Sequence, residues 1–84
     1  MASDLERAIS AAHQAQLNFL LVEISSGIAL TKFRHPSARV CARTAYNVAV
    51  RSLRRATLPE AEREKVLAAL QRLKRRLEEL GETF

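Results

Sequence analysis

The chain has 84 residues, of which 14 are basic and nine acidic, and it contains one cysteine, two glycines and two prolines. A chain this short forms one domain, and its single cysteine excludes an internal disulfide. The scarcity of turn residues and the abundance of alanine, leucine, arginine and glutamate exclude a sheet protein and predict an all-α fold.

The N-terminal segment predicts neither secretion nor membrane insertion. It begins Met1-Ala2-Ser3-Asp4, which is polar and lacks the basic start of a secretory signal. The most apolar stretch covers only residues 17–30 and contains Glu23, whereas a membrane span needs roughly 20 apolar residues. We therefore expect a cytoplasmic protein with no membrane contact.

The first helix is expected over residues 4–33. Ser3 and Glu6 have the spacing of a capping box at its start, and Pro36 stops it. At 1.5 Å per residue this helix is about 45 Å long, against about 30 Å for each of the others. Two shorter helices cannot cover it. Either it bends near 25–27, where serine and glycine lower helix propensity, or part of it packs on something else.

Two opposite faces of this first helix are apolar. One face carries Leu17, Leu20, Leu21, Ile24 and Ile28, and the other carries Phe19, Val22, Ala29, Leu30 and Phe33. A helix that is apolar on two opposed faces is buried on both, but a three-helix chain covers only one. We therefore predict that the second set forms an interface, either in a C2 homodimer or with another helical protein. The alternative is a helix broken near Gly27 and folded into a four-helix monomer.

The second helix is expected over residues 37–56, with small residues on one face. These are Ala38, Cys41, Ala42, Ala45, Ala49, Leu53 and Ala56. Small side chains let helices approach closely but bury little area per residue, so the core is expected to be thin. An unpaired cysteine is more often a small core residue than a reactive one, so Cys41 is expected to be buried.

The positive charge is concentrated in the middle of the sequence. Residues 24–59 contain no acidic residue, and the other face of the second helix carries Arg39, Arg43, Arg51, Arg54 and Arg55. Guanidinium groups pair with phosphate in a fixed fork, so this face is a candidate site for an anion or a nucleic acid. The alternative is a solvated face, whose last two arginines complement the helix dipole.

The third helix is expected over residues 58–80. Thr57 and Glu60 have capping-box spacing, and Gly81 suits the position after the last turn. A single apolar seam contains Val66, Leu70, Leu73, Leu77 and Leu80. These features predict a core-facing helix of a three-helix bundle. Residues 81–84 are expected to be a loose tail, unless Phe84 folds back.

No combination of residues predicts catalysis, a metal site or a cofactor. His13 lies within the first helix and His35 precedes a proline at a turn, with no second ligand at a workable spacing from either. Glu23 is the only carboxylate with apolar neighbours, and it is more easily explained by exposure to water or by an ion pair across an interface. Phosphate-binding and nucleophile motifs are missing from the sequence, so we do not expect an enzyme.

Part of the second helix resembles a known repeat. Ala42, Tyr46 and Ala49 have the spacing found in the second helix of a tetratricopeptide repeat, and Phe33 stands where its first helix often has an aromatic residue. The sequence departs from the repeat at Ser26, Ala29-Leu30 and Arg54, which stand in place of Trp, Leu-Gly and Pro. The whole chain also resembles short uncharacterised bacterial helical proteins. The resemblance implies a role in protein interaction.

Overall fold

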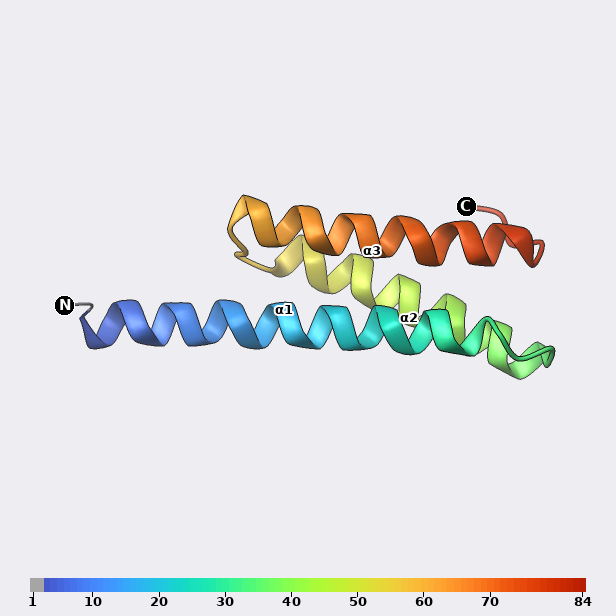
Figure 1. Cartoon of the computed structure of the whole chain (residues 1–84), viewed down its shortest axis with the longest axis horizontal. Helices are drawn as coiled ribbons and strands as arrows, with labels where there is room; N and C mark the ends of the chain where they lie inside the picture. Colours follow the sequence, from blue (N-terminus) through green and yellow to red (C-terminus); the bar gives the residue numbers. More distant parts are fainter. Residues whose placement is uncertain (1–2) are drawn as a thin grey trace.

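The structure, a computed structural model, describes residues 3–84 and consists of three helices (Figure 1). They are α1 (Asp4–Leu30), α2 (Pro36–Arg55) and α3 (Glu60–Glu79), which run in alternating directions and are joined by short turns. The predicted all-α bundle with a long first helix is confirmed. The radius of gyration is 14.7 Å, whereas a compact domain of this length would have about 12 Å. The molecule is therefore elongated, measuring 51 × 18 × 17 Å.

The start of α1 is fixed by the predicted capping box. The Ser3 hydroxyl accepts a hydrogen bond from the Glu6 N–H at 3.1 Å, and the Glu6 carboxylate accepts one from the Ser3 N–H at 3.3 Å. The helix then continues unbroken through residues 25–27, so the bend and the four-helix alternative are not found. It ends at Leu30, earlier than predicted, because residues 31–33 form a tight turn.

Gly27 lies at a close approach of the three helices. It is buried, and a Cβ atom there would lie 2.9 Å from Leu73 Cδ2 on α3 and 3.2 Å from Ala45 Cβ on α2. The glycine therefore serves close packing rather than a bend. Ala42, Ala45 and Ala49, three of the small residues predicted on α2, are buried in the same region of the core.

The core combines the predicted inner face of α1, the small face of α2 and the seam of α3. Its buried members are Leu17, Leu20, Ile24, Ala42, Ala45, Ala49, Leu53, Val66, Ala69, Leu70, Leu73 and Leu77. Cys41 is not among them. The prediction that it is buried is wrong, because Cys41 lies about 100° round α2 from Ala42 and is exposed there.

The start of α3 differs from the prediction, whereas Gly81 after its last turn has the predicted conformation. The helix begins at Glu60 with Pro59 at the N-cap and no side-chain cap, so the predicted capping box of Thr57 is wrong. Thr57 lies further back in the connecting turn, where its N–H donates to the Gln16 side chain at 3.4 Å. At the other end Gly81 has φ +96°, the left-handed conformation that the sequence predicts there.

No helix in the described part of the chain is long and apolar enough to cross a membrane.

Candidate interaction surfaces

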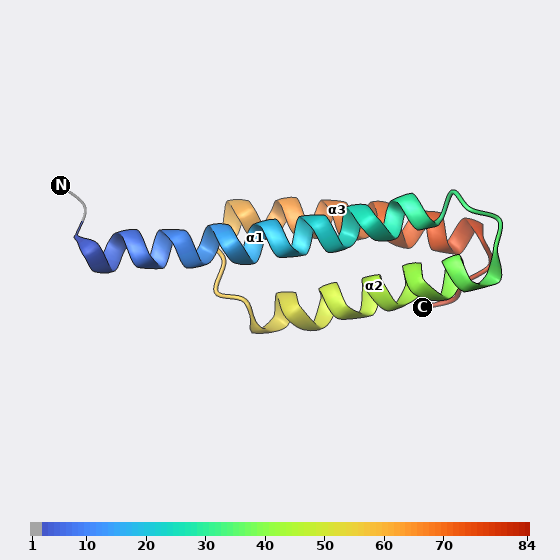
Figure 2. The same ribbon diagram turned by 90° about the horizontal axis from the view of Figure 1, so that it is seen from below.

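The first part of α1 extends beyond the other two helices. The turn between α2 and α3 meets α1 at Gln16, and residues 4–15, here called the arm, have no neighbouring helix (Figures 1 and 2). Every arm residue is exposed except His13, which is half-buried. Leu5 is 70% exposed and Ile9 is 47% exposed. The arm is therefore a bare helix of about 18 Å, and the rest of the molecule is here called the body.

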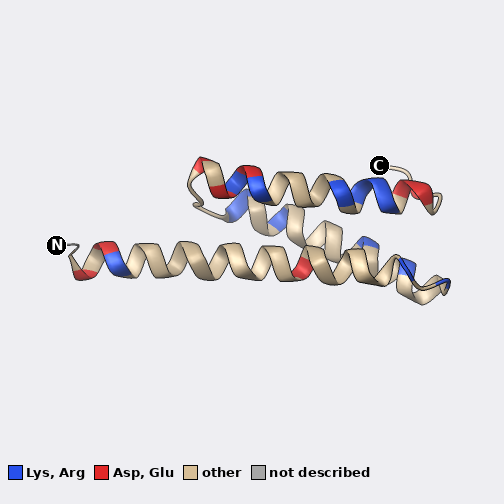
Figure 3. Cartoon of the chain, viewed as in Figure 1, with Lys and Arg blue, Asp and Glu red and all other residues tan. Residues whose placement is uncertain are grey.

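A continuous row of exposed residues runs along α1 from the arm to the turn that follows it. Its members are spaced alternately three and four residues apart: Leu5, Ala8, Ala12, Ala15, Phe19, Val22, Ser26, Ala29 and Phe33. We call this row the outer stripe. Alternating three- and four-residue spacing is the pattern of a coiled-coil seam. Between Arg7 and Lys32, α1 carries only one charged residue, Glu23 (Figure 3).

The inner face of α1 behaves differently from the outer stripe. In the body it is apolar and buried, with Leu17, Leu20 and Ile24 facing α2 and α3. The same face continues into the arm as His13 and Ser10, which are polar. The inner face thus becomes polar where the body ends, while the outer stripe is apolar at every position except Ser26. The outer stripe is therefore a long, largely apolar surface that the fold leaves uncovered.

Four of the five residues predicted to form an interface lie on this stripe. Phe19, Val22, Ala29 and Phe33 are all exposed. The fifth, Leu30, is half-buried and packs against the core, so it does not belong to this surface.

The arm half of the stripe was not predicted from the sequence. Leu5, Ala8, Ala12 and Ala15 continue the spacing of Phe19 and the residues after it. That regular spacing was the signal that could have identified them.

The arginines predicted on α2 are divided between two environments. Arg39 donates to the Leu80 carbonyl at 2.9 Å and forms an ion pair with Glu82 at 3.4 Å. Arg43 donates to the Thr83 carbonyl at 2.8 Å. These two arginines therefore hold the C-terminal tail against α2, which is the stated alternative, in which Phe84 folds back, and not a loose tail over residues 81–84.

The last residue of this tail, Phe84, folds back onto α2. Its ring lies 3.9 Å from the Arg43 guanidinium carbon and makes an edge contact with Tyr46, with 4.9 Å between the ring centres. Lys74 of α3 lies 5.4 Å from the same ring. Cation–π and aromatic contacts thus close this end of the bundle.

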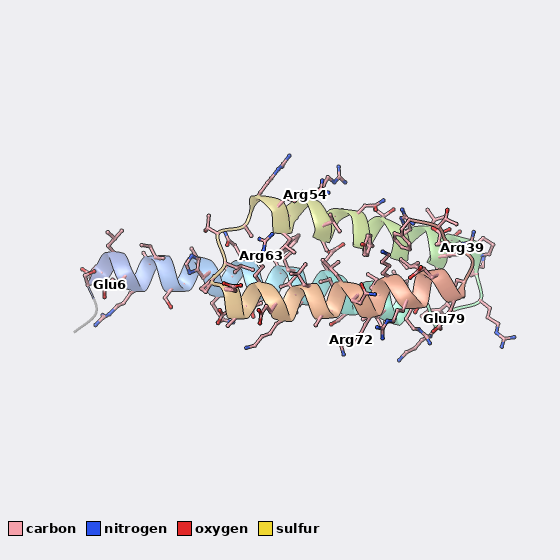
Figure 4. The ribbon with its side chains drawn as sticks, turned by 90° about the horizontal axis from the view of Figure 1, so that it is seen from above. Glu6, Arg39, Arg54, Arg63, Arg72 and Glu79 are labelled. Carbon is pink, nitrogen blue, oxygen red and sulfur yellow. The ribbon has the colours of Figure 1, made fainter. Side chains whose placement is uncertain are left out.

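The other three predicted arginines, Arg51, Arg54 and Arg55, are exposed near the end of α2. Figure 4 shows Arg54 pointing away from the bundle. Arg54 also borders a shallow groove of about 290 Å³ between α2 and α3. The groove is lined by Tyr46, Val50, Leu53, Arg54, Arg63, Leu67, Leu70, Gln71 and Lys74. The five arginines do not form one free face, because only these three are left uncovered by the tail.

The candidate chemical residues lie apart from one another. His35 caps α2, where its Nδ1 accepts the Ser37 N–H at 3.1 Å, while His13 lies on the arm. Among residues 3–84, no group of three or more His, Cys, Asp or Glu side chains could hold a metal ion. The arrangement offers surfaces for binding rather than an enclosed site.

The chain matches no known protein family, and neither a characterised relative nor a similar solved structure was found for it.

Proposed function

We propose that this protein is a helical interaction module that self-associates through the outer stripe of α1, forming a homodimer. The observation that carries the proposal is that the stripe is exposed along the whole helix, arm included, and apolar at every position except Ser26. Exposed apolar patches of this kind mark interaction sites in folded proteins. The resemblance of residues 42–49 to a tetratricopeptide helix points to the same class of function.

The arm supplies the physical reason for a partner. Isolated helices shorter than about 12–15 residues are marginal in water, and helices in proteins owe most of their stability to packing. The Ser3–Glu6 capping box and a hydrogen bond between Gln14 and Asn18 are the side-chain contacts that support the arm. A second helix packed on the outer stripe would bury Leu5 and extend the hydrophobic contact along α1.

The exposed Cys41 thiol suits a reducing compartment such as the cytoplasm.

The test compares the same substitution at two exposed apolar residues. Val22 lies on the outer stripe and is 65% exposed, while Leu67 lies on α3 beside the groove between α2 and α3 and is 48% exposed. We expect wild-type protein and Leu67→Glu to sediment as dimers, and Val22→Glu as a monomer, because a buried carboxylate without a partner is strongly unfavourable. The proposal fails if the wild type is monomeric up to about 100 µM, where even a weak specific interface is populated.

Nucleic-acid binding is a second candidate, favoured by the exposure of Arg51, Arg54 and Arg55 on one end of α2. It predicts a mobility shift of duplex DNA or RNA at low salt that weakens steeply as salt rises. The logarithm of the binding constant falls linearly with the logarithm of the salt concentration, and each phosphate contact adds nearly one to the slope. Replacing all three arginines with glutamine should therefore reduce this slope by about three. An unchanged mobility of both nucleic acids at low salt would eliminate this candidate.

A further inference from the structure

We infer that the two copies of α1 pair antiparallel, so that the arm of each chain lies on the outer stripe of the other chain's body. This inference rests on the proposed self-association and specifies its geometry. It follows from three independent features of the stripe: the order of large and small side chains, the charges at its two ends, and the position of the body on the opposite face.

The side-chain sizes along the stripe do not suit a parallel pair. In a parallel coiled coil each position faces its own copy. Phe19 would then meet Phe19, while Ala12 would meet Ala12 and Ala15 would meet Ala15. Two helices would be held apart at the phenylalanines and left with gaps at the alanines. Packed interfaces have the density of protein interiors, so this alternation is unfavourable.

An antiparallel pair places a small residue in every layer. The layers in one register are Leu5 with the partner's Ala29, Ala8 with the partner's Ser26, Ala12 with the partner's Val22, and Ala15 with the partner's Phe19. The twofold axis repeats each of these layers at the other end of the pair. All eight side chains are exposed in the single chain, so none has to leave the core to form them.

The charges at the two ends favour the same orientation. The arm begins with Asp4 and Glu6, while Lys32 and Arg34 follow the other end of α1. A parallel pair would bring like charges together at both ends. In the antiparallel register Asp4 flanks the partner's Lys32, in the position where charged residues set the orientation of coiled coils.

The body leaves room for this partner. α2 and α3 pack on the inner face of α1, and neither runs alongside the arm (Figures 1 and 2). Phe19 borders α2 at a small hollow lined by Ser52, Arg55 and Ala56, yet every residue of the outer stripe is exposed. The tip of an incoming arm would lie beside a hollow of about 600 Å³ between Phe33, Val40 and Leu80, whose rim carries Arg34 and Arg39. The acidic tip of the arm therefore meets a basic and partly apolar surface.

Disulfide trapping tests this arrangement in the full chain. In a Cys41→Ser background, Ala8→Cys and Ser26→Cys are prepared separately and together, because both changes are small and both sites are exposed. The two positions lie about 27 Å apart on one helix, so no disulfide forms within a chain. We expect the double variant to form a covalent dimer under mild oxidation, and neither single variant to do so.

The outcomes separate this inference from the proposed function. If sedimentation shows a dimer and each single variant forms a disulfide with itself, the pair is parallel and only the antiparallel inference fails. If a dimer is present but none of the three variants is trapped, the interface lies elsewhere, and both fail. If the unmodified chain is monomeric, the self-association itself is overturned.

Discussion

The arm and the body contain parts of the same helix in opposite environments. In the body, α1 buries its inner face against α2 and α3 and exposes Phe19 and Val22 on the other side. In the arm, both sides are exposed, yet only the inner side becomes polar, at His13 and Ser10. The two sides of the arm therefore differ in polarity although both are exposed. In the proposed dimer, the polar side would face water and the apolar side would face the partner.

The largest expected difference between arm and body is in the free energy of unfolding that is lost when an isoleucine in each is replaced by alanine. Ile24 is 1% exposed in the body, and Ile9 is 47% exposed in the arm. We expect Ile24→Ala to lower the free energy of unfolding by about 3 kcal/mol, because it leaves a cavity in a packed core. Ile9→Ala should lower it by less than about 0.5 kcal/mol in dilute, monomeric protein. Urea unfolding measures both. Equal losses would mean that the arm is packed on the body in solution.

A somewhat smaller loss of stability is expected when Gly27, at the close approach of the three helices in the body, is replaced by a larger residue. Gly27→Val should destabilise the fold by about 2 kcal/mol, because the new side chain overpacks the contacts with Leu73 and Ala45. Ser25→Val, on the exposed side of the same turn, is the control and should change stability little. Thermal unfolding of the two variants distinguishes them. A Gly27→Val variant as stable as the wild type would show that the helices pack less tightly at this point than the contacts of Gly27 indicate.

The tail contact of the body should contribute about 1 kcal/mol, the size of a partly exposed cation–π and aromatic contact. Phe84→Ala removes the ring from Arg43 and Tyr46. Phe33→Ala serves as the control, because Phe33 is also exposed but lies in the turn after α1. Tyr46 is the only tyrosine and the chain has no tryptophan, so its fluorescence reports the contact directly. The signal should change in Phe84→Ala and stay unaltered in Phe33→Ala.

The smallest effect on global stability is expected at the tip of the arm. Ser3→Ala removes one side of the capping box, which is worth about 1 kcal/mol in a helix that must stay folded. In the dilute monomer the arm opens without the body, so amides in its first turns should exchange about five times faster. The free energy of unfolding should change by less than about 0.5 kcal/mol. A larger loss in urea unfolding would show that arm and body unfold together.

Local patterns in the sequence predicted much of this fold because they depend on residues close along the chain. The Ser3–Glu6 capping box, the inner face of α1, and the glycine after α3 were all visible as spacings. The exposed apolar face with Phe19 and Val22 was visible in the same way. Its continuation through the arm alanines is harder to recognise, because alanine is also the strongest helix former and occurs on every face of a helix.

The features that were wrongly predicted or left open concern contacts between distant parts of the chain. The tail is held by Arg39 and Arg43, which lie about 40 residues earlier, and no local pattern indicates that pairing. Thr57 has the spacing of a cap, but its backbone binds the Gln16 side chain of another helix instead. Cys41 lies at the edge of the small face of α2, where the direction of the neighbouring helices decides whether it is covered.

The bare arm also gives the proposed dimer a dependence on its own abundance. By mass action, each tenfold rise in free partner above the dissociation constant adds about 1.4 kcal/mol to the stability of the bound state. In the proposed dimer this added stability would go to the arm, because the body already has its own core. Opening of the arm would therefore become rarer as the concentration of the protein rises.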